Sequence, residues 1–283
     1  MVDSNPHQSG LLLFLVATLV AAAGSRGLSN DAPAAPEQID LSNFPGEIVD
    51  QVVVPIPAEI FAVLDKLDEP DWSSGIIVPE GTGKSAEVAI LALTFGSLVG
   101  EGFIAVQAEQ SNQIQEIGRK VLKLSESLGL KSAVQPHSLS IIEAADSRDW
   151  EAVREELDST QQTVRATMEK LRDEELADLV SLGGWLRGTN VVTYFISESF
   201  REDKAELLNQ PGLISHFREM LNAMEGPSSS SPEIRSISTG LARMEAIIAA
   251  ENEISEEEIN ELYSISQEML EQYYFDLESE KGG

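Results

Sequence analysis

The longest apolar run beyond the N-terminal residues covers residues 88–106, which contain one charged side chain, Glu101. As an α-helix this run would be about 28 Å long, enough to cross a small domain or a lipid bilayer. Acidic residues flank this run on both sides, and no cluster of basic residues lies beside it. Both features argue against a membrane-spanning helix. We therefore expect a helix buried at the centre of a helical bundle, with a membrane helix as the alternative.

Polar and small residues fall on different sides of this predicted helix. At 100° per residue, Glu87, Thr94 and Glu101 share one narrow face. Gly96 and Gly100 lie nearly opposite, and glycines four residues apart allow another backbone to approach closely. The polar face is either an exposed or hydrogen-bonded edge, or a pair of buried carboxylates in a pocket.

Residues 174–200 form a second notable helical segment. Gly184 and Gly188 are also four residues apart, which predicts close packing beside the first helix. Four polar residues of this segment share one face: Arg187, Asn190, Tyr194 and Glu198. We expect Arg187 to pair with Glu101 or Glu87, because an unpaired charge in such apolar surroundings costs too much to remain ionised.

These two faces together make the candidate binding site. It consists of Glu87, Thr94, Glu101, Arg187, Asn190, Tyr194 and Glu198. The pattern assigns no catalytic residue and no metal ligand to it.

The rest of the chain also has helical periodicity. Further helices are predicted at residues 58–67, 111–128, 148–172, 202–208, 211–224, from Ser231 onward, and from Ser255 to about Tyr274. Gly129 marks a helix end, and Ser255 with Glu258 forms a capping box. Ser140 with Glu143 predicts another box, at the start of a short helix ending near Ala145.

These patterns predict an all-α fold, a single compact multi-helix bundle around the central apolar helix. Residues 47–57 are predicted to form an extended segment or a short strap because of Pro55 and Pro57, and no run of alternating strands is present. The helical domain covers residues 47–283, of which residues 231–275 can form an appended helical hairpin.

The N-terminal residues predict export. Residues 1–23 resemble a signal peptide, with an apolar core at 11–20 and small residues at 21–23 for cleavage. The leader contains Asp3 and His7 but neither Lys nor Arg, which is atypical. Residues 24–46 have the composition of a flexible, disordered linker. We expect a periplasmic or secreted protein without stable membrane insertion after cleavage.

Charge and composition narrow the possible partners. The formal net charge of −29 argues against nucleic-acid binding, which requires clustered Lys and Arg. The chain has no cysteine, so disulfides, thiolate catalysis and cysteine-ligated metals are excluded. An acidic C-terminal region, with eleven acidic residues from Glu251 onward, is either a solvated face or a docking surface for a basic partner.

Motif searches favour no enzyme class. The turn Gly81-Thr82-Gly83-Lys84-Ser85 lacks the first glycine of a phosphate loop, since that position is Val78. His137 and His216 belong to no metal-spaced pair, and they are expected in a loop or helix start and on a helix surface. No cofactor is predicted.

The leading hypothesis is therefore an exported, non-enzymatic module that binds an unidentified protein or small molecule. The alternative is a carboxylate-based enzyme with a pocket at Glu87, Glu101 and Arg187, since carboxylates with perturbed pKa values can act as general acids or bases. Convergence of both carboxylates on one pocket would favour the enzyme, and a solid core there would favour the binding module.

Overall fold

The computed structural model describes residues 47–49, 52–54, 57–81, 87–171, 174–250 and 253–275. The predicted signal peptide at 1–23 and the predicted linker at 24–46 lie outside these residues. So do residues 82–86, which contain most of the glycine-lysine turn.

The described chain is all-α apart from one short hairpin. Strands β1 (Glu47–Val49) and β2 (Val52–Val54) pair antiparallel, with Ile48 opposite Val53. The α-helices are α1 (Pro57–Leu64), α2 (Val88–Gln107), α3 (Ser111–Ser127), α4 (Lys131–Asp146), α5 (Trp150–Leu171), α6 (Glu174–Glu198), α7 (Glu202–Ala205), α8 (Pro211–Ala223), α9 (Pro232–Ile248) and α10 (Glu256–Glu271). Short 3-10 turns lie at Asp65–Leu67, Trp72–Gly75, Glu206–Leu208 and Pro227–Ser230.

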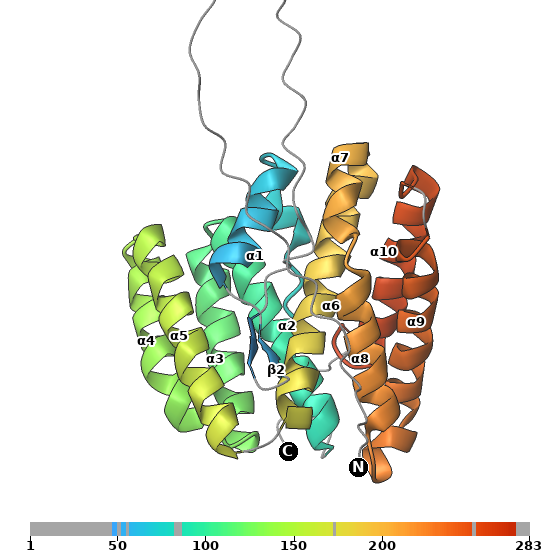
Figure 1. The fold of residues 1–283 in the computed structure, drawn as a ribbon. Coiled ribbons are helices and arrows are strands. Elements are labelled where there is room, and N and C mark those ends of the chain that lie inside the picture. The colour runs from blue at the N-terminus through green and yellow to red at the C-terminus, as the bar shows by residue number, and fades with distance from the viewer. Residues whose placement is uncertain are drawn as a thin grey trace, which may run out of the picture. The chain divides into compact units, whose positions relative to one another are not determined.

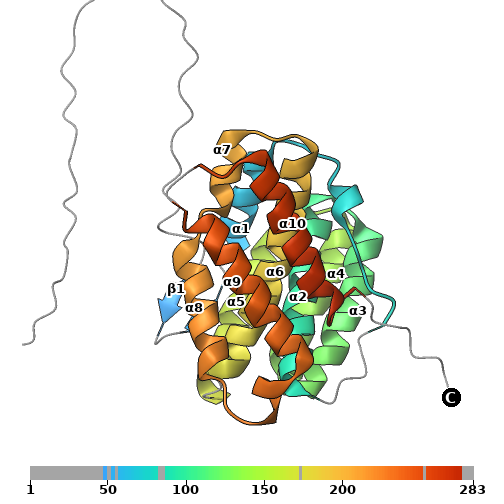
Figure 2. The ribbon, with the colours of Figure 1, turned by 90° about the vertical axis from the view of Figure 1, so that its right-hand side faces the viewer.

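Helices α2 and α6 occupy the centre of this arrangement (Figure 1). Helices α3, α4 and α5 lie on one side of them. Helices α8, α9 and α10 lie on the other side, and α10 packs against α6 (Figure 2). The central position of α2 explains why its sequence is apolar nearly all round: neighbours cover it on several sides.

Glycines bring α2 and α6 into backbone contact. A Cβ atom placed on Gly96 would lie 1.9 Å from the carbonyl oxygen of Val180, and one on Gly183 would lie 2.1 Å from that of Leu93. The predicted contact through Gly184 is present, since its Cβ position is 3.4 Å from the Gly96 oxygen. The prediction for Gly188 is wrong, because a Cβ atom there would meet nothing within 4 Å. Gly188 instead lines a cavity between the helices.

Among the described residues, α2 is the one helix long and apolar enough to span a membrane. In its most apolar 18-residue window, 72% of the residues are buried within the protein. The core helix of a globular bundle has both properties, because its apolar surface is covered by protein.

Most predicted helix ends agree with the structure, and one does not. Gly129 has a φ of 71°, and both hydrogen bonds of the Ser255–Glu258 capping box are present. The predicted helix start at Ser140 is wrong, because α4 begins at Lys131 and the Ser140 hydroxyl donates to the Pro136 carbonyl within it. Pro136 removes only the bond to the carbonyl of residue 132, which is exposed and can be hydrated.

Candidate functional site

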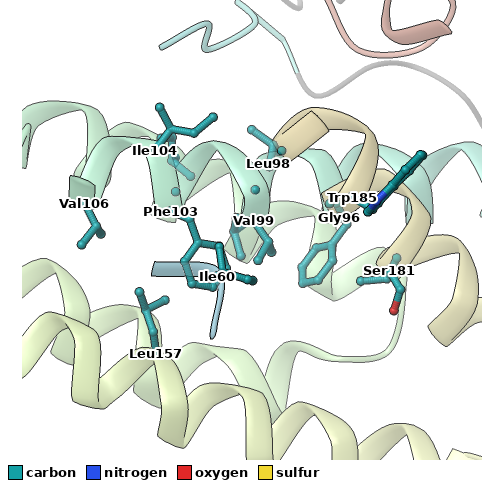
Figure 3. Close-up of a pocket in the computed structure, with 18 of the residues that line it drawn as sticks. Ile60, Gly96, Leu98, Val99, Phe103, Ile104, Val106, Leu157, Ser181 and Trp185 are labelled. Atoms are coloured by element: carbon teal, nitrogen blue, oxygen red, sulfur yellow. The ribbon is translucent and has the colours of Figure 1, made fainter. Parts of the chain in front are cut away.

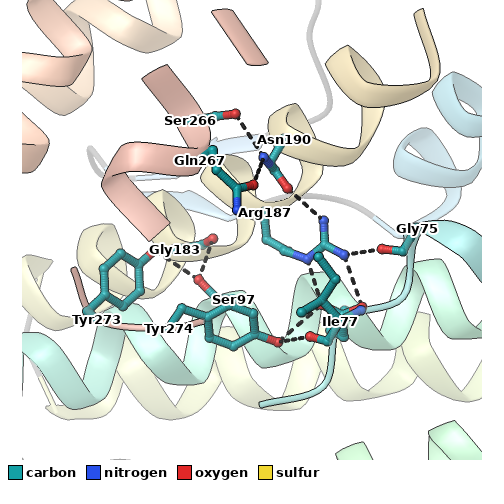
Figure 4. Close-up of polar contacts among 11 residues, drawn as sticks. Gly75, Ile77, Ser97, Gly183, Arg187, Asn190, Ser266, Gln267, Tyr273 and Tyr274 are labelled. Atoms are coloured by element: carbon teal, nitrogen blue, oxygen red, sulfur yellow. Dashed lines mark hydrogen bonds and ion pairs between the residues drawn. The ribbon is translucent and has the colours of Figure 1, made fainter. Parts of the chain in front are cut away.

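A buried ion pair joins the two central helices. Arg187 of α6 is 1% exposed and Glu101 of α2 is 0% exposed. Arg187 Nε lies 2.6 Å from Glu101 Oε2, and Nη2 lies 3.1 Å from Oε1 (Figure 4). The predicted pairing of Arg187 with Glu101 is therefore confirmed, and it is bidentate, the geometry that guanidinium and carboxylate groups favour.

Neighbouring groups satisfy the rest of this pair. Arg187 also donates to the Gly75 carbonyl and to Asn190 Oδ1, the latter at 3.2 Å. Glu101 accepts a bond from the Ile77 backbone N–H at 2.7 Å and one from the Tyr274 hydroxyl at 3.2 Å. Both charges can be buried because each has several hydrogen-bond partners.

Burial and charge shift the pKa values of this cluster. Burial acts to lower the pKa of Arg187, but the adjacent Glu101 carboxylate outweighs it and raises that pKa above its ordinary value. Burial, followed by the Glu101 charge, raises the pKa of Tyr274 well above 10. Arg187 therefore remains a cation and Tyr274 a neutral hydrogen-bond donor at physiological pH.

A second polar group lies along the same face of α2. The Ser97 hydroxyl donates to the Gly183 carbonyl at 2.9 Å and lies 2.9 Å from the Tyr273 hydroxyl. Thr94 Oγ1 donates to the Ile90 carbonyl at 2.8 Å and, at 3.4 Å, to the Tyr273 carbonyl. The C-terminal end of α10 is thus fixed to the core by polar contacts.

The structure brings together only part of the predicted site. Asn190 is buried and bridges Arg187 to α10 through Ser266, at 3.0 Å from its hydroxyl. Tyr194 is half-buried, with its ring 5.9 Å from that of Tyr263. Glu198 and Glu87 are both exposed, at the end of α6 and before the start of α2. Glu87 does not share the environment of Glu101, because the two residues are 14 positions apart along α2 and therefore lie far apart in space.

Sequence reasoning missed the groups that complete the cluster. Tyr273 and Tyr274 lie in the turn that follows α10, and Gly75 and Ile77 lie between α1 and α2, so no shared helix face links these groups to Arg187 or Glu101. The two adjacent tyrosines after α10 could have indicated part of this cluster, because a buried phenol usually has a hydrogen-bond partner.

His137 is placed differently from the expectation, whereas His216 lies on a helix with part of its side chain exposed, as predicted. His137 lies within α4, half-buried, with Nδ1 2.5 Å from Glu156 Oε1 and Nε2 2.9 Å from Thr163 Oγ1. His216, on α8, is half-buried and lies 3.3 Å from the Asp178 carboxylate. A hydrogen bond from the His216 ring to the Asp178 carboxylate raises the pKa of His216 above 6.5.

A cavity of about 260 Å³ lies on the other side of α2. Helices α1 to α6 and α8 contribute to its wall. Figure 3 shows Val99 and Phe103 extending from α2 and Leu157 from α5 toward the space between them. Neither Glu101 nor Arg187 lines this cavity. The buried ion pair and the cavity are therefore separate features on different faces of α2.

The described part of the cavity wall is almost entirely hydrocarbon and contains no ionisable side chain. Its polar side chains are Ser138, Thr160, Ser181, Thr189 and Gln210, together with the indole of Trp185. Gln210 accepts a bond from Trp185 Nε1 at 2.9 Å and donates to the Leu207 carbonyl at 2.9 Å. Thr160 and Ser181 bond to carbonyls of their own helices.

No family model, curated protein or solved structure matches this chain. Among the described residues, no group of three His, Asp or Glu side chains could hold a metal ion.

Proposed function

We propose that this protein is a non-enzymatic binding protein that holds a small apolar molecule in the cavity between α2, α5 and α6. The observation that carries the proposal is a cavity of about 260 Å³ between these helices whose wall is almost entirely hydrocarbon. Apolar cavities with only a few polar groups in their walls are the usual binding sites of small molecules.

The size of the cavity defines the size of the ligand. An apolar cavity of about 150 Å³ in another protein stays dry and binds benzene. At about 30 Å³ per water-sized group, 260 Å³ accommodates about nine non-hydrogen atoms. The proposed ligand is therefore larger than one aromatic ring and smaller than a long-chain lipid.

The buried charges support binding rather than carboxylate catalysis. The Glu101 carboxylate accepts hydrogen bonds from Ile77, Arg187 and Tyr274, and it does not line the cavity. Glu87 is exposed and distant along α2. A general acid or base must reach the proton it transfers, and this pair offers no substrate such access.

We also propose that the protein acts outside the cytoplasm. Support comes from the apolar segment at residues 11–20 and the small residues at 21–23. N-terminal sequencing of the protein from its own source tests this: a new N-terminus near residue 24 is expected, and retention of Met1 in the exported fraction would contradict it.

Naphthalene, an uncharged probe of suitable size, tests the proposed function. Isothermal titration calorimetry of the wild type should give saturable one-to-one binding. Gly188 lines the cavity, and a Cβ atom there meets nothing within 4 Å, so Gly188→Leu should fill the space and abolish binding. Leucine is also a better helix former than glycine, so this variant should remain folded.

Gly212 provides the matched control for this substitution. A Cβ atom at this glycine also meets nothing within 4 Å, but Gly212 is exposed on α8 and does not line the cavity. Gly212→Leu should bind naphthalene as the wild type does. Equal binding by the wild type and Gly188→Leu, or no binding by the wild type, would overturn the proposal.

A further inference from the structure

Two hydroxyl groups in the cavity wall have no hydrogen-bond partner within the described part of the chain. Ser138 of α4 and Thr189 of α6 line the cavity, and each residue is 7% exposed. Neither hydroxyl donates or accepts a bond, although every other polar side chain of the described wall does so. Neither hydroxyl oxygen is among the fully buried atoms that lack a partner, so both retain accessible surface and are free to bond to a molecule that enters the cavity.

A water molecule beside either hydroxyl would have few other polar partners in the cavity. A buried water molecule is stable when it has two to four polar partners. Around Ser138 and Thr189 the wall offers hydrocarbon, and the other polar side chains are already bonded to protein. A ligand oxygen can accept a bond from a hydroxyl while its own hydrocarbon body fills the apolar space.

The wall also limits the charge of the ligand. Among its described residues there is no Lys, Arg, His, Asp or Glu. A carboxylate or ammonium group in this space would lose its hydration without gaining an ionic partner, which is strongly unfavourable. An uncharged oxygen loses much less on transfer from water, and a hydrogen bond from a hydroxyl compensates it.

We propose that the ligand is an uncharged molecule of about nine non-hydrogen atoms, with a hydrocarbon body and one carbonyl or hydroxyl oxygen that accepts a hydrogen bond from Ser138 or Thr189. Medium-chain ketones, aldehydes and alcohols, and small terpenoids of the same size, belong to this class. This inference rests on the proposed function, because it describes the ligand of the same cavity.

The test compares ligands of equal size in one assay. Calorimetry would measure binding of 2-octanone, 1-octanol, nonane, heptanoate and octylammonium to the wild type, Ser138→Ala and Thr189→Val. The decisive quantity is the ratio of the affinity for 2-octanone to that for nonane in each protein. Hydration of the free ligands cancels when this ratio is compared between proteins, so only the contribution of the hydroxyl remains.

In at least one of the two variants, this ratio should fall about three- to tenfold below the wild-type value, because one hydrogen bond is lost. Nonane should bind to all three proteins equally well. Thermal unfolding of the free variants should match that of the wild type, because neither hydroxyl has a partner to lose. Heptanoate and octylammonium should bind at least tenfold more weakly than 2-octanone.

The outcomes of this test separate the inference about the ligand from the proposed function of the cavity. An unchanged ratio in both variants, or charged ligands that bind as well as the ketone, would overturn this inference while leaving the proposed function in place. If neither nonane nor 2-octanone binds to the wild type, both the inference and the proposed function fail.

Discussion

The guanidinium of Arg187 and the carboxylate of Glu101 form a bidentate ion pair, with Nε and Oε2 2.6 Å apart, although 86 positions separate the two residues in the chain. The pair lies between the two central helices and is closed to solvent. It joins α2 to α6 on a face of α2 that does not line the cavity.

Loss of one partner of this pair should strongly destabilise the protein. Arg187→Met leaves the Glu101 charge buried, and we expect the free energy of unfolding to fall by about 3–5 kcal/mol. The double variant Glu101→Gln with Arg187→Met should be less destabilised than the sum of the two single variants, because no uncompensated charge remains. Urea denaturation followed by circular dichroism measures each value.

The exposed pair of Arg243 and Glu268, with N and O 2.6 Å apart, is the control. Arg243→Met should change the free energy of unfolding by less than about 1 kcal/mol, as exposed ion pairs usually do. Equal effects of Arg187→Met and Arg243→Met would show that the buried pair has no special role.

The glycines at the crossing of α2 and α6 should tolerate no side chain. A Cβ atom at Gly96 would lie 1.9 Å from a backbone oxygen, so Gly96→Ala must separate the helices, with an expected loss of about 3 kcal/mol or more. Gly188→Ala should instead stabilise the protein by about 0.5–1 kcal/mol, because it removes a glycine from a helix interior without a clash. Thermal unfolding compares the two variants, and a stable Gly96→Ala would contradict the close crossing.

His216 should make stability depend on pH. The hydrogen bond with Asp178 raises the pKa of the folded His216 above the ordinary 6.5. A raised folded pKa gives stabilisation that is complete below about 6.5 and is lost as pH rises through the folded value. The stability difference between the wild type and His216→Gln should therefore shrink as the pH is raised through this range.

NMR titration of the His216 ring checks the cause. The pKa should lie above 6.5 in the wild type and should fall in Asp178→Asn, which removes the negative partner. An unchanged titration in that variant would exclude Asp178 as the source of the shift.

The buried tyrosines should limit stability in alkali. Burial raises the pKa values of Tyr273 and Tyr274 above the ordinary 10, so these phenols ionise in the unfolded chain before they do in the folded one. Stability is therefore unaffected below about pH 10 and is lost as pH rises above it. Ultraviolet absorption of phenolate should show these tyrosines titrating together with unfolding, and Tyr273→Phe should move the transition to higher pH.

The helices could largely be predicted because their apolar residues recur at helical spacing. The capping box at Ser255 and the glycine at 129 also act locally, so the sequence alone reveals them. Ser140 shows where this local reasoning fails. Ser140 and Glu143 have the spacing of a capping box, but the helix begins earlier, at Lys131. It continues through Pro136, so Ser140 lies inside it.

The ion pair could be predicted because a lone Arg and a lone Glu in two apolar helices have few other partners. The rest of the site depends on contacts that periodicity does not encode. Tyr274 reaches Glu101 from 173 residues away, and the Ile77 backbone reaches it from a loop. The cavity is less predictable still, because its apolar wall residues look like ordinary core residues until the packing of α5 against α2 is known.

The most direct measurement is a crystal structure of the wild-type protein soaked with 1-bromooctane, with the bromine located by its anomalous signal. The account predicts a bromine peak between α2, α5 and α6, beside Val99, Phe103 and Leu157. A cavity filled by repacked side chains, with bromine absent or bound only at the surface, would contradict it.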